Sequence, residues 1–136
     1  MTYSTFETEL AVRPDDIDMN NHVHNTKYLD YVLAARYDQM KRCYGMAMDS
    51  FLERGLSWVV NTCFIQFKRP LFLGESIRVR THIAEVADTH AKVAFEILKK
   101  ANGKLSADGY FDYTLINART GRAEKLPQDV IEKYSI

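Results

Sequence analysis

The spacing of hydrophobic residues changes along the chain, and each spacing predicts a different element. Residues 5–13 alternate loosely between apolar and polar side chains, which is typical of a strand. From residue 25 to residue 43 the apolar side chains recur every three or four positions, which predicts an amphipathic helix. At ~1.5 Å per residue such a helix is about 27 Å long, enough to cross a whole sheet. Its stripe consists of Tyr28, Tyr31, Val32, Ala35, Gln39 and Cys43, widened by Leu29 and Leu33.

The rest of the chain has mainly the pattern of strands. A short helix over residues 47–54, ended by Gly55, comes first. Asn102-Gly103 predicts a type I′ hairpin turn, because both residues tolerate a positive φ. Residues 127–134 predict a terminal helix with Pro in its first turn. Four segments rich in β-branched and aromatic residues are expected to be strands, with a break at residues 70–74 after the first: 57–69, 75–87, 89–99 and 104–117.

This order of elements predicts an α+β fold in a single domain that spans residues 1–136. Consecutive strands with short connections are expected to pair antiparallel. One long helix and about five strands bury their apolar faces together if a curved sheet wraps around the helix. An open sheet edge would remain, and we expect a second copy of the chain to extend or stack on the sheet.

The densest polar segment lies between the first predicted strand and the long helix. Residues 12–28 contain three Asp, two His and three Asn side chains. At the N-terminus of a helix, unpaired backbone N–H groups and the helix dipole favour negative charge. The segment therefore predicts a site in which a carboxylate faces the first N–H groups of the helix.

Six motifs occur in an order that is known from one family of enzymes. They are Asp16-Ile-Asp18, the run from Asn20 to Tyr28, Ala35-Arg36, the run from Phe67 to Glu75, Thr120-Gly121-Arg122 and Leu126-Pro127. Together they resemble the hotdog-fold acyl thioesterases, above all the 4-hydroxybenzoyl-CoA thioesterase-like group and the related acyl-ACP thioesterases. This resemblance covers nearly the whole chain and implies the hotdog fold, a long central helix wrapped by a curved antiparallel sheet.

The junction departs from the family pattern at two positions. The family often has Gly where Asn21 stands, and Asn also tolerates left-handed backbone angles, so the turn is expected to survive. The usual Asn-Asn pair is His24-Asn25 here. The second departure puts more doubt on the role of position 24 than on that of position 25.

The resemblance implies that Asp18 carries out the hydrolysis of a thioester. Its carboxylate either deprotonates a water molecule or attacks the carbonyl itself to form an anhydride, and the sequence leaves both routes open. Backbone N–H groups near Asn25 are implied to bind the developing oxyanion. An ordinary Asx-turn is the alternative for Asp18, and a helix cap is the alternative for Asn25.

For the other polar side chains of the junction, the sequence gives weaker support for a role in catalysis. His22 binds substrate, assists proton transfer or holds the loop, and we favour the last of these. Asp16 is expected to raise the pKa of Asp18 through like-charge repulsion, whereas Asp15 is expected to be a solvated acid. A metal pair of His22 and His24 is disfavoured, because no further His or Cys has suitable spacing.

Several residues are candidates for binding the substrate. Tyr28 is either a core side chain or one whose hydroxyl reaches the pocket. Lys68 and Arg69 are expected to bind the phosphates of CoA or an acidic carrier protein, with solvated strand ends as the alternative. Arg78, Arg80, Lys99 and Lys100 are weaker candidates of the same kind. Trp58, Thr62 and Phe64 are candidates for an acyl pocket, with plain core as the alternative.

Composition narrows the class of protein. Lys plus Arg equals Asp plus Glu at 18 each, which argues against a nucleic-acid binder driven by bulk charge. No apolar run approaches the roughly 18 residues that span a bilayer, and the N-terminus lacks the features of a secretory signal. We therefore expect a cytoplasmic protein with no nucleic-acid or membrane partner. Cys43 and Cys63 are expected to be reduced and buried.

These observations predict a thioesterase that hydrolyses an acyl-CoA or acyl-ACP substrate. It is expected to need no metal and no organic cofactor, with CoA or phosphopantetheine entering only as part of the substrate. The active unit is expected to be a homodimer or homotetramer. The alternatives are a hotdog enoyl-thioester hydratase or dehydratase, whose motifs the chain lacks, and a non-catalytic module that binds acyl thioesters. No Gly-x-Ser-x-Gly elbow of a serine hydrolase is present.

Overall fold

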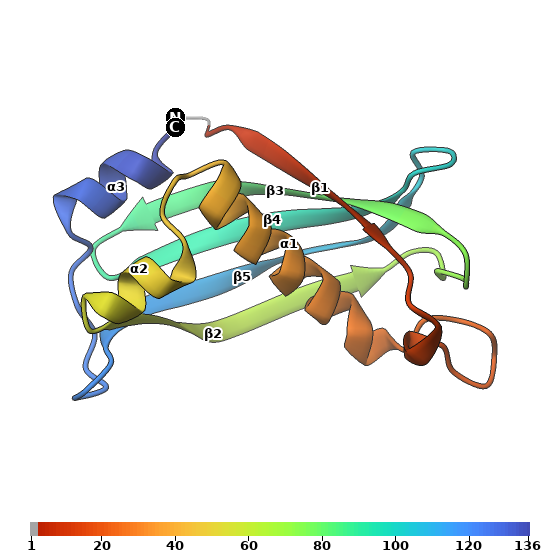
Figure 1. Cartoon of the computed structure of the whole chain (residues 1–136), viewed down its shortest axis with the longest axis horizontal. Helices are drawn as coiled ribbons and strands as arrows, with labels where there is room; N and C mark the ends of the chain where they lie inside the picture. The colour runs from red at the N-terminus through yellow and green to blue at the C-terminus, as the bar shows by residue number, and fades with distance from the viewer. Residues whose placement is uncertain (1–2) are drawn as a thin grey trace.

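The computed structural model describes residues 3–136 as two layers, a five-stranded sheet and a long helix that lies across one face of it (Figure 1). The helix, α1, spans Tyr28–Arg42. Two short helices, α2 and α3, lie near one end of the sheet. The α+β fold predicted from the sequence is confirmed. The other elements are β1 (Thr5–Ala11), α2 (Met48–Glu53), β2 (Leu56–Phe67), β3 (Ser76–Ala87), β4 (His90–Lys99), β5 (Leu105–Asn117) and α3 (Gln128–Tyr134).

The strands follow the order β1-β3-β4-β5-β2 across the sheet, and every neighbouring pair is antiparallel. The prediction that consecutive strands pair is confirmed for β3 with β4 and for β4 with β5. It is wrong for β2 and β3, because β4 and β5 lie between them and the connection over residues 68–75 crosses to the far side. β2 pairs with β5 along one side only, so its other side offers unpaired backbone groups.

The central helix begins later than predicted. Asn25–Lys27 form a 3-10 turn that starts with a hydrogen bond from the Lys27 N–H to the His24 carbonyl oxygen at 2.9 Å. The α-helix itself begins at Tyr28, and no side chain caps either start. The helix cap considered as an alternative for Asn25 is therefore wrong, because the tighter turn provides the first backbone bond instead.

One face of α1 packs on the sheet as the spacing of its apolar residues predicts. Tyr28, Tyr31, Val32, Ala35 and Gln39 are buried, and Cys43 is half-buried. Leu33 does not belong to this face, since its side chain is 44% exposed. It lies on the side of α1 that faces β2, where the sheet leaves the helix uncovered and a groove opens.

A glycine in β5 permits the close approach of β2 and β5. Gly109 in β5 lies opposite Ile65, and a Cβ atom at this glycine would come within 1.8 Å of the Phe64 carbonyl oxygen. Only glycine therefore permits the close approach of the two strands at this point.

The β4–β5 hairpin has a positive φ at Gly103 but not at Asn102, so the predicted type I′ turn is wrong.

The cysteines differ from the expectation of burial. Cys43 is half-buried at the C-terminal end of α1, and Cys63 is exposed because it lies on the edge strand β2. Within residues 3–136, none of the helices is long and apolar enough to cross a membrane.

Candidate active site

A tight turn presents Asp18 beside the start of the central helix. The Asp18 N–H donates to the His22 carbonyl oxygen at 2.8 Å, and the Asn21 N–H donates to the Asp18 carbonyl oxygen at 3.1 Å. Asn21 has a φ of 63°, so Asn does adopt the left-handed backbone that was expected at this position. The turn thereby fixes the backbone of Asp18 relative to the loop that leads into α1.

The Asp18 carboxylate is held by two backbone amides. Its Oδ1 accepts from the N–H groups of Asn20 at 2.8 Å and His22 at 3.1 Å, which is the Asx-turn considered as an alternative. These bonds, above all the one from His22, lower the pKa of Asp18. The expectation that Asp16 raises this pKa is wrong, because hydrogen bonds to the charged form dominate. Oδ2 accepts no hydrogen bond from residues 3–136, so one oxygen remains available.

All six predicted site residues line one cavity of about 610 Å³. Its walls come from the loop after β1, the first turn of the helix and the segment that follows β2. The cavity is therefore assembled from parts of the chain that are about 45 residues apart in sequence. The six residues are Asp18, His22, Asn25, Tyr28, Lys68 and Arg69.

The start of the helix supplies hydrogen-bond donors to this cavity. Asn25 and Thr26 both line it, and among the described residues their backbone N–H groups have no hydrogen-bond acceptor. Such free donors are expected in the first turn of a helix, where the dipole also favours negative charge. Asp18 and the two residues that carry these amides thus line the same cavity.

Tyr28 ties the helix to the loop between β2 and β3. Its side chain is buried, and its hydroxyl accepts a hydrogen bond from the Leu71 N–H at 3.1 Å. The Leu71 carbonyl oxygen in turn accepts from the Val23 N–H at 2.9 Å. Burial raises the pKa of Tyr28, so its hydroxyl stays protonated at neutral pH. Tyr28 is therefore both a core residue and part of the cavity wall.

Asp16 anchors the loop that carries Asp18 to the central helix, a role that the sequence did not reveal. Its carboxylate is almost completely buried, and Oδ2 accepts from the Tyr31 hydroxyl at 2.7 Å. The Arg13 Nε lies 3.4 Å from the same oxygen, and the Asp16 carbonyl oxygen accepts from the His24 N–H at 2.9 Å. The only signal in the sequence was a Tyr on the buried face of α1 together with an acid in the junction.

The histidines differ in their surroundings. The half-buried His22 packs its ring edge-to-face on Phe72, with 5.1 Å between the ring centroids, and pairs with Phe72 in a short β-bridge. These contacts favour the loop-holding hypothesis for His22. His24 is exposed. In the part of the chain that the structure describes, no group of three or more His, Cys, Asp or Glu side chains is placed to hold a metal ion.

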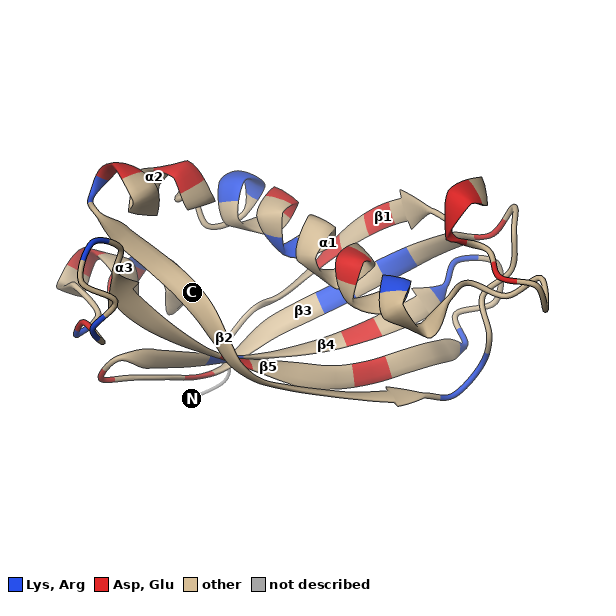
Figure 2. Cartoon of the chain, turned by 90° about the horizontal axis from the view of Figure 1, so that it is seen from below, with Lys and Arg blue, Asp and Glu red and all other residues tan. Residues whose placement is uncertain are grey.

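Basic residues follow the end of β2 beside the start of α1 (Figure 2). Lys68 and Arg69 are exposed, and neither forms an ion pair within residues 3–136. The Arg69 Nη1 donates to the Leu105 carbonyl oxygen at 2.8 Å, which orients its guanidinium. Three weaker candidates for phosphate binding are instead paired with glutamates: Arg80 with Glu7, Lys99 with Glu75 and Lys100 with Glu9.

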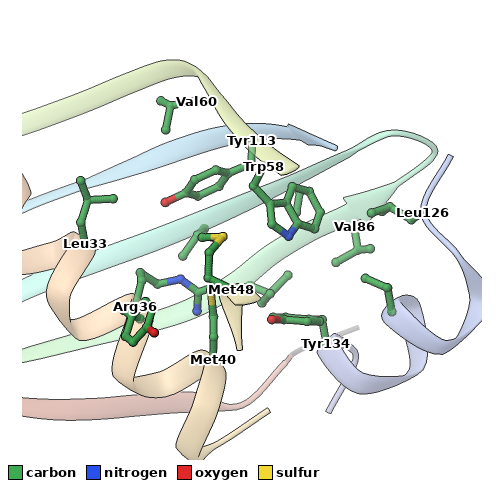
Figure 3. A pocket seen from close by; sticks show the side chains of 15 residues that line it. Leu33, Arg36, Met40, Met48, Trp58, Val60, Val86, Tyr113, Leu126 and Tyr134 are labelled. Atoms are coloured by element: carbon green, nitrogen blue, oxygen red, sulfur yellow. The ribbon is translucent and has the colours of Figure 1, made fainter. Parts of the chain in front are cut away.

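A second cavity, of about 300 Å³, lies further along the groove between α1 and β2 (Figure 3). Its walls are mainly apolar side chains from α1, the sheet and α3. Trp58 lines it, as predicted for an acyl pocket, but Thr62 and Phe64 do not. Both are exposed on β2.

An antiparallel five-stranded sheet with one long helix across its face is the architecture of hotdog-fold thioesterases. A family model described as the thioesterase-like superfamily matches residues 12–134. The chain belongs to this superfamily and is a thioester hydrolase. The resemblance inferred from the motifs is thereby confirmed.

Individual relatives agree with this assignment. The chain is 24% identical over 130 residues to the long-chain acyl-CoA thioesterase FadM of Escherichia coli, a match that covers 93% of this chain and 95% of FadM. Its fold is similar to that of DHNA-CoA thioesterase from Staphylococcus aureus, with a TM-score of 0.90 and 21% identity over 96% of this chain and 89% of the other. It is also similar to the 1,4-dihydroxy-2-naphthoyl-CoA thioesterase Slr0204 from Synechocystis, with a TM-score of 0.87 and 19% identity over 96% of each chain.

Proposed function

We propose that this protein hydrolyses acyl-CoA thioesters and that Asp18 is its catalytic carboxylate. The observation that carries the proposal is the shared cavity of Asp18 and the unpaired N–H groups of Asn25 and Thr26. The lowered pKa of Asp18 keeps the carboxylate charged at neutral pH, which a base or a nucleophile requires. The relation to FadM, whose name specifies an acyl-CoA substrate, supports CoA as the carrier.

The reaction adds the elements of water across the bond between the acyl carbon and sulfur. Asp18 acts as a general base that takes a proton from water, or as a nucleophile whose acyl anhydride water then cleaves. The carbonyl oxygen becomes negative as the tetrahedral intermediate forms, and the N–H groups of Asn25 and Thr26 stabilise it. The carbon–sulfur bond then breaks, and the CoA thiolate takes up a proton. His22 holds the Asp18 turn in place through its backbone and its contact with Phe72.

The two ends of the substrate have separate places in this proposal. Lys68 and Arg69 line the first cavity and are exposed, so they are free to bind CoA phosphates. Tyr28 lines the same cavity as these cations. The acyl group runs along the groove between α1 and β2 into the second cavity, whose apolar lining favours it.

We further propose that the active unit is a homodimer joined along β2. This strand lies at the edge of the sheet and is exposed over most of its length. Exposed apolar side chains lie along it and on the uncovered side of α1, a surface that a single chain leaves in water. They are Val59, Val60, Phe64 and Phe67 on β2 and Leu33 and Tyr37 on α1. The expected cytoplasmic location stays a prediction.

A panel of acyl-CoA and acyl-ACP thioesters, assayed by release of the free thiol, tests the proposed reaction. We expect acyl-CoA substrates to be cleaved with a kcat/KM in the ordinary enzyme range of about 10⁴–10⁸ M⁻¹s⁻¹ for the best acyl group. Activity confined to acyl-ACP would correct the carrier. Tight binding of acyl-CoA without thiol release would replace the enzyme with a binding module.

A further inference from the structure

The second cavity contains one charged side chain in otherwise apolar surroundings. Arg36 extends from α1 into the cavity between Met40, Met48 and Tyr134 (Figure 3). Only 7% of Arg36 is exposed, and its Nη1 has no hydrogen-bond partner within residues 3–136. A buried guanidinium is normally paired with an anion, because removing an unpaired charge from water is costly.

The residues around Arg36 do not supply that anion. Arg36 takes part in none of the ion pairs formed by residues 3–136. Its guanidinium lies 5.5 Å from the centre of the Tyr44 ring, a contact that stabilises a cation only in part. The hydroxyl of Tyr44 is itself buried without a partner. Burial raises the pKa values of Tyr44, Tyr113 and Tyr134, so these neighbours are neutral at pH 7.

Arg36 lies at a distance from the first cavity that an acyl chain can span. Eight residues separate it from Tyr28, which borders the first cavity, and at ~1.5 Å per residue this is about 12 Å along the helix. An acyl chain of about this length, with its thioester at the start of α1, would therefore end near Arg36. On this path the acyl chain would pass Leu33 and Val60, two apolar residues that line the second cavity.

We propose that the preferred acyl group ends in a carboxylate, so that the substrate is the CoA monothioester of a dicarboxylic acid. This inference rests on the proposed function and specifies its substrate class. A carboxylate matches the planar donor fork of Arg36 and gives the buried charge its partner. The apolar walls bind the methylene chain between the two ends, and a plain alkyl chain would leave Nη1 of Arg36 without a partner.

Matched pairs of acyl-CoA substrates test this inference directly, for example decanedioyl-CoA against decanoyl-CoA and longer and shorter pairs. For the best chain length we expect wild-type kcat/KM to be at least about 30-fold higher for the carboxylate-ended member, the lower end of what a buried charge pair is worth. Arg36→Met should abolish or reverse this ratio. Arg36→Lys, which keeps the charge without the fork, should restore part of it.

Two controls separate recognition from folding. Arg119→Met removes an exposed arginine that lies outside both cavities, and it should leave the ratio unchanged. Thermal unfolding of each variant shows whether the fold survives. Trp58 is the sole tryptophan and lines the same cavity, so its fluorescence reports binding of the free diacid and the free monoacid without any catalysis.

The outcomes distinguish this inference from the proposed function. Equal kcat/KM for both members of each pair, or a ratio that Arg36→Met leaves unchanged, would overturn the inference while the thioesterase stands. A change of dimer dissociation in Arg36→Met with an unchanged ratio would mean that a second copy supplies the anion, which also overturns it. If no thioester is cleaved, the proposed function fails, and preferential quenching of Trp58 by the diacid still decides whether the cavity recognises a carboxylate.

Discussion

The Tyr31 hydroxyl donates a hydrogen bond to the buried Asp16 carboxylate across 2.7 Å, and this bond joins the central helix to the loop that carries Asp18. Asp16 is two residues before Asp18, so its anchoring fixes where the Asp18 turn begins. Burial and the bond to Asp16 together raise the pKa of Tyr31 to about 12, which keeps the donor protonated. The pair connects the buried core with the geometry of the site.

Tyr31→Phe should lower both stability and activity. Loss of a hydrogen bond to a buried charged group is expected to cost about 1.5–3 kcal/mol in the free energy of unfolding, measured by urea titration. Thioester hydrolysis should fall mainly through kcat, because the Asp18 turn loses its anchor. Tyr110→Phe is the matched control, since the Tyr110 hydroxyl bonds to no residue in the described range. A Tyr31→Phe enzyme with wild-type stability and kcat would show that Asp16 needs no anchor.

The pH dependence of activity should reflect the lowered pKa of Asp18. The backbone N–H of His22 favours the charged form, so the acidic limb of kcat/KM should lie below the ordinary value of 3.8. The same shift stabilises the folded state above this ordinary pKa, and that contribution disappears as the pH falls through the lower pKa of the folded state. Rate profiles with short pre-incubation separate titration from acid unfolding. An acidic limb near neutral pH would contradict a charged Asp18.

A lysine on the exposed strand β2 should weaken the proposed dimer. Thr62→Lys places a charge on the unpaired edge, where strand-to-strand association would bury it. We expect sedimentation velocity to shift from dimer to monomer and activity to fall with it. Ala84→Lys, also exposed but on the interior strand β3, should leave both unchanged. A wild-type protein that is monomeric at every concentration and fully active would refute the dimer.

The sequence predicted the elements better than their arrangement. The period of the apolar residues located α1 and all five strands to within a few residues, because burial of one face imposes that period. It could not show that β2 pairs with β5 rather than β3, since pairing depends on how the connection over residues 68–75 crosses the sheet. The exposure of Leu33 was missed for the same reason, because the groove beside α1 exists only once β2 is at the edge.

The site was predicted in part. Asp18, His22, Asn25 and Tyr28 are close in sequence, so a single motif named them, and the structure places them around one cavity with Lys68 and Arg69. Arg36 appeared only as part of a family motif, and its burial without an anion depends on packing by α2, α3 and β2. The direction of the Asp18 pKa shift also required coordinates, because two backbone amides outweigh the nearby acid.

Replacement of the Asp18 carboxylate tests the account most directly. Asp18→Asn keeps the size of the side chain and an oxygen for the Asx-turn but removes the charge. Asp15→Asn removes the charge of an exposed acid outside the cavity. We expect kcat for the best acyl-CoA to fall at least about 100-fold in Asp18→Asn, with substrate binding retained, and to stay at the wild-type level in Asp15→Asn. Unchanged turnover by a folded Asp18→Asn enzyme would contradict the assignment of this residue as the catalytic group.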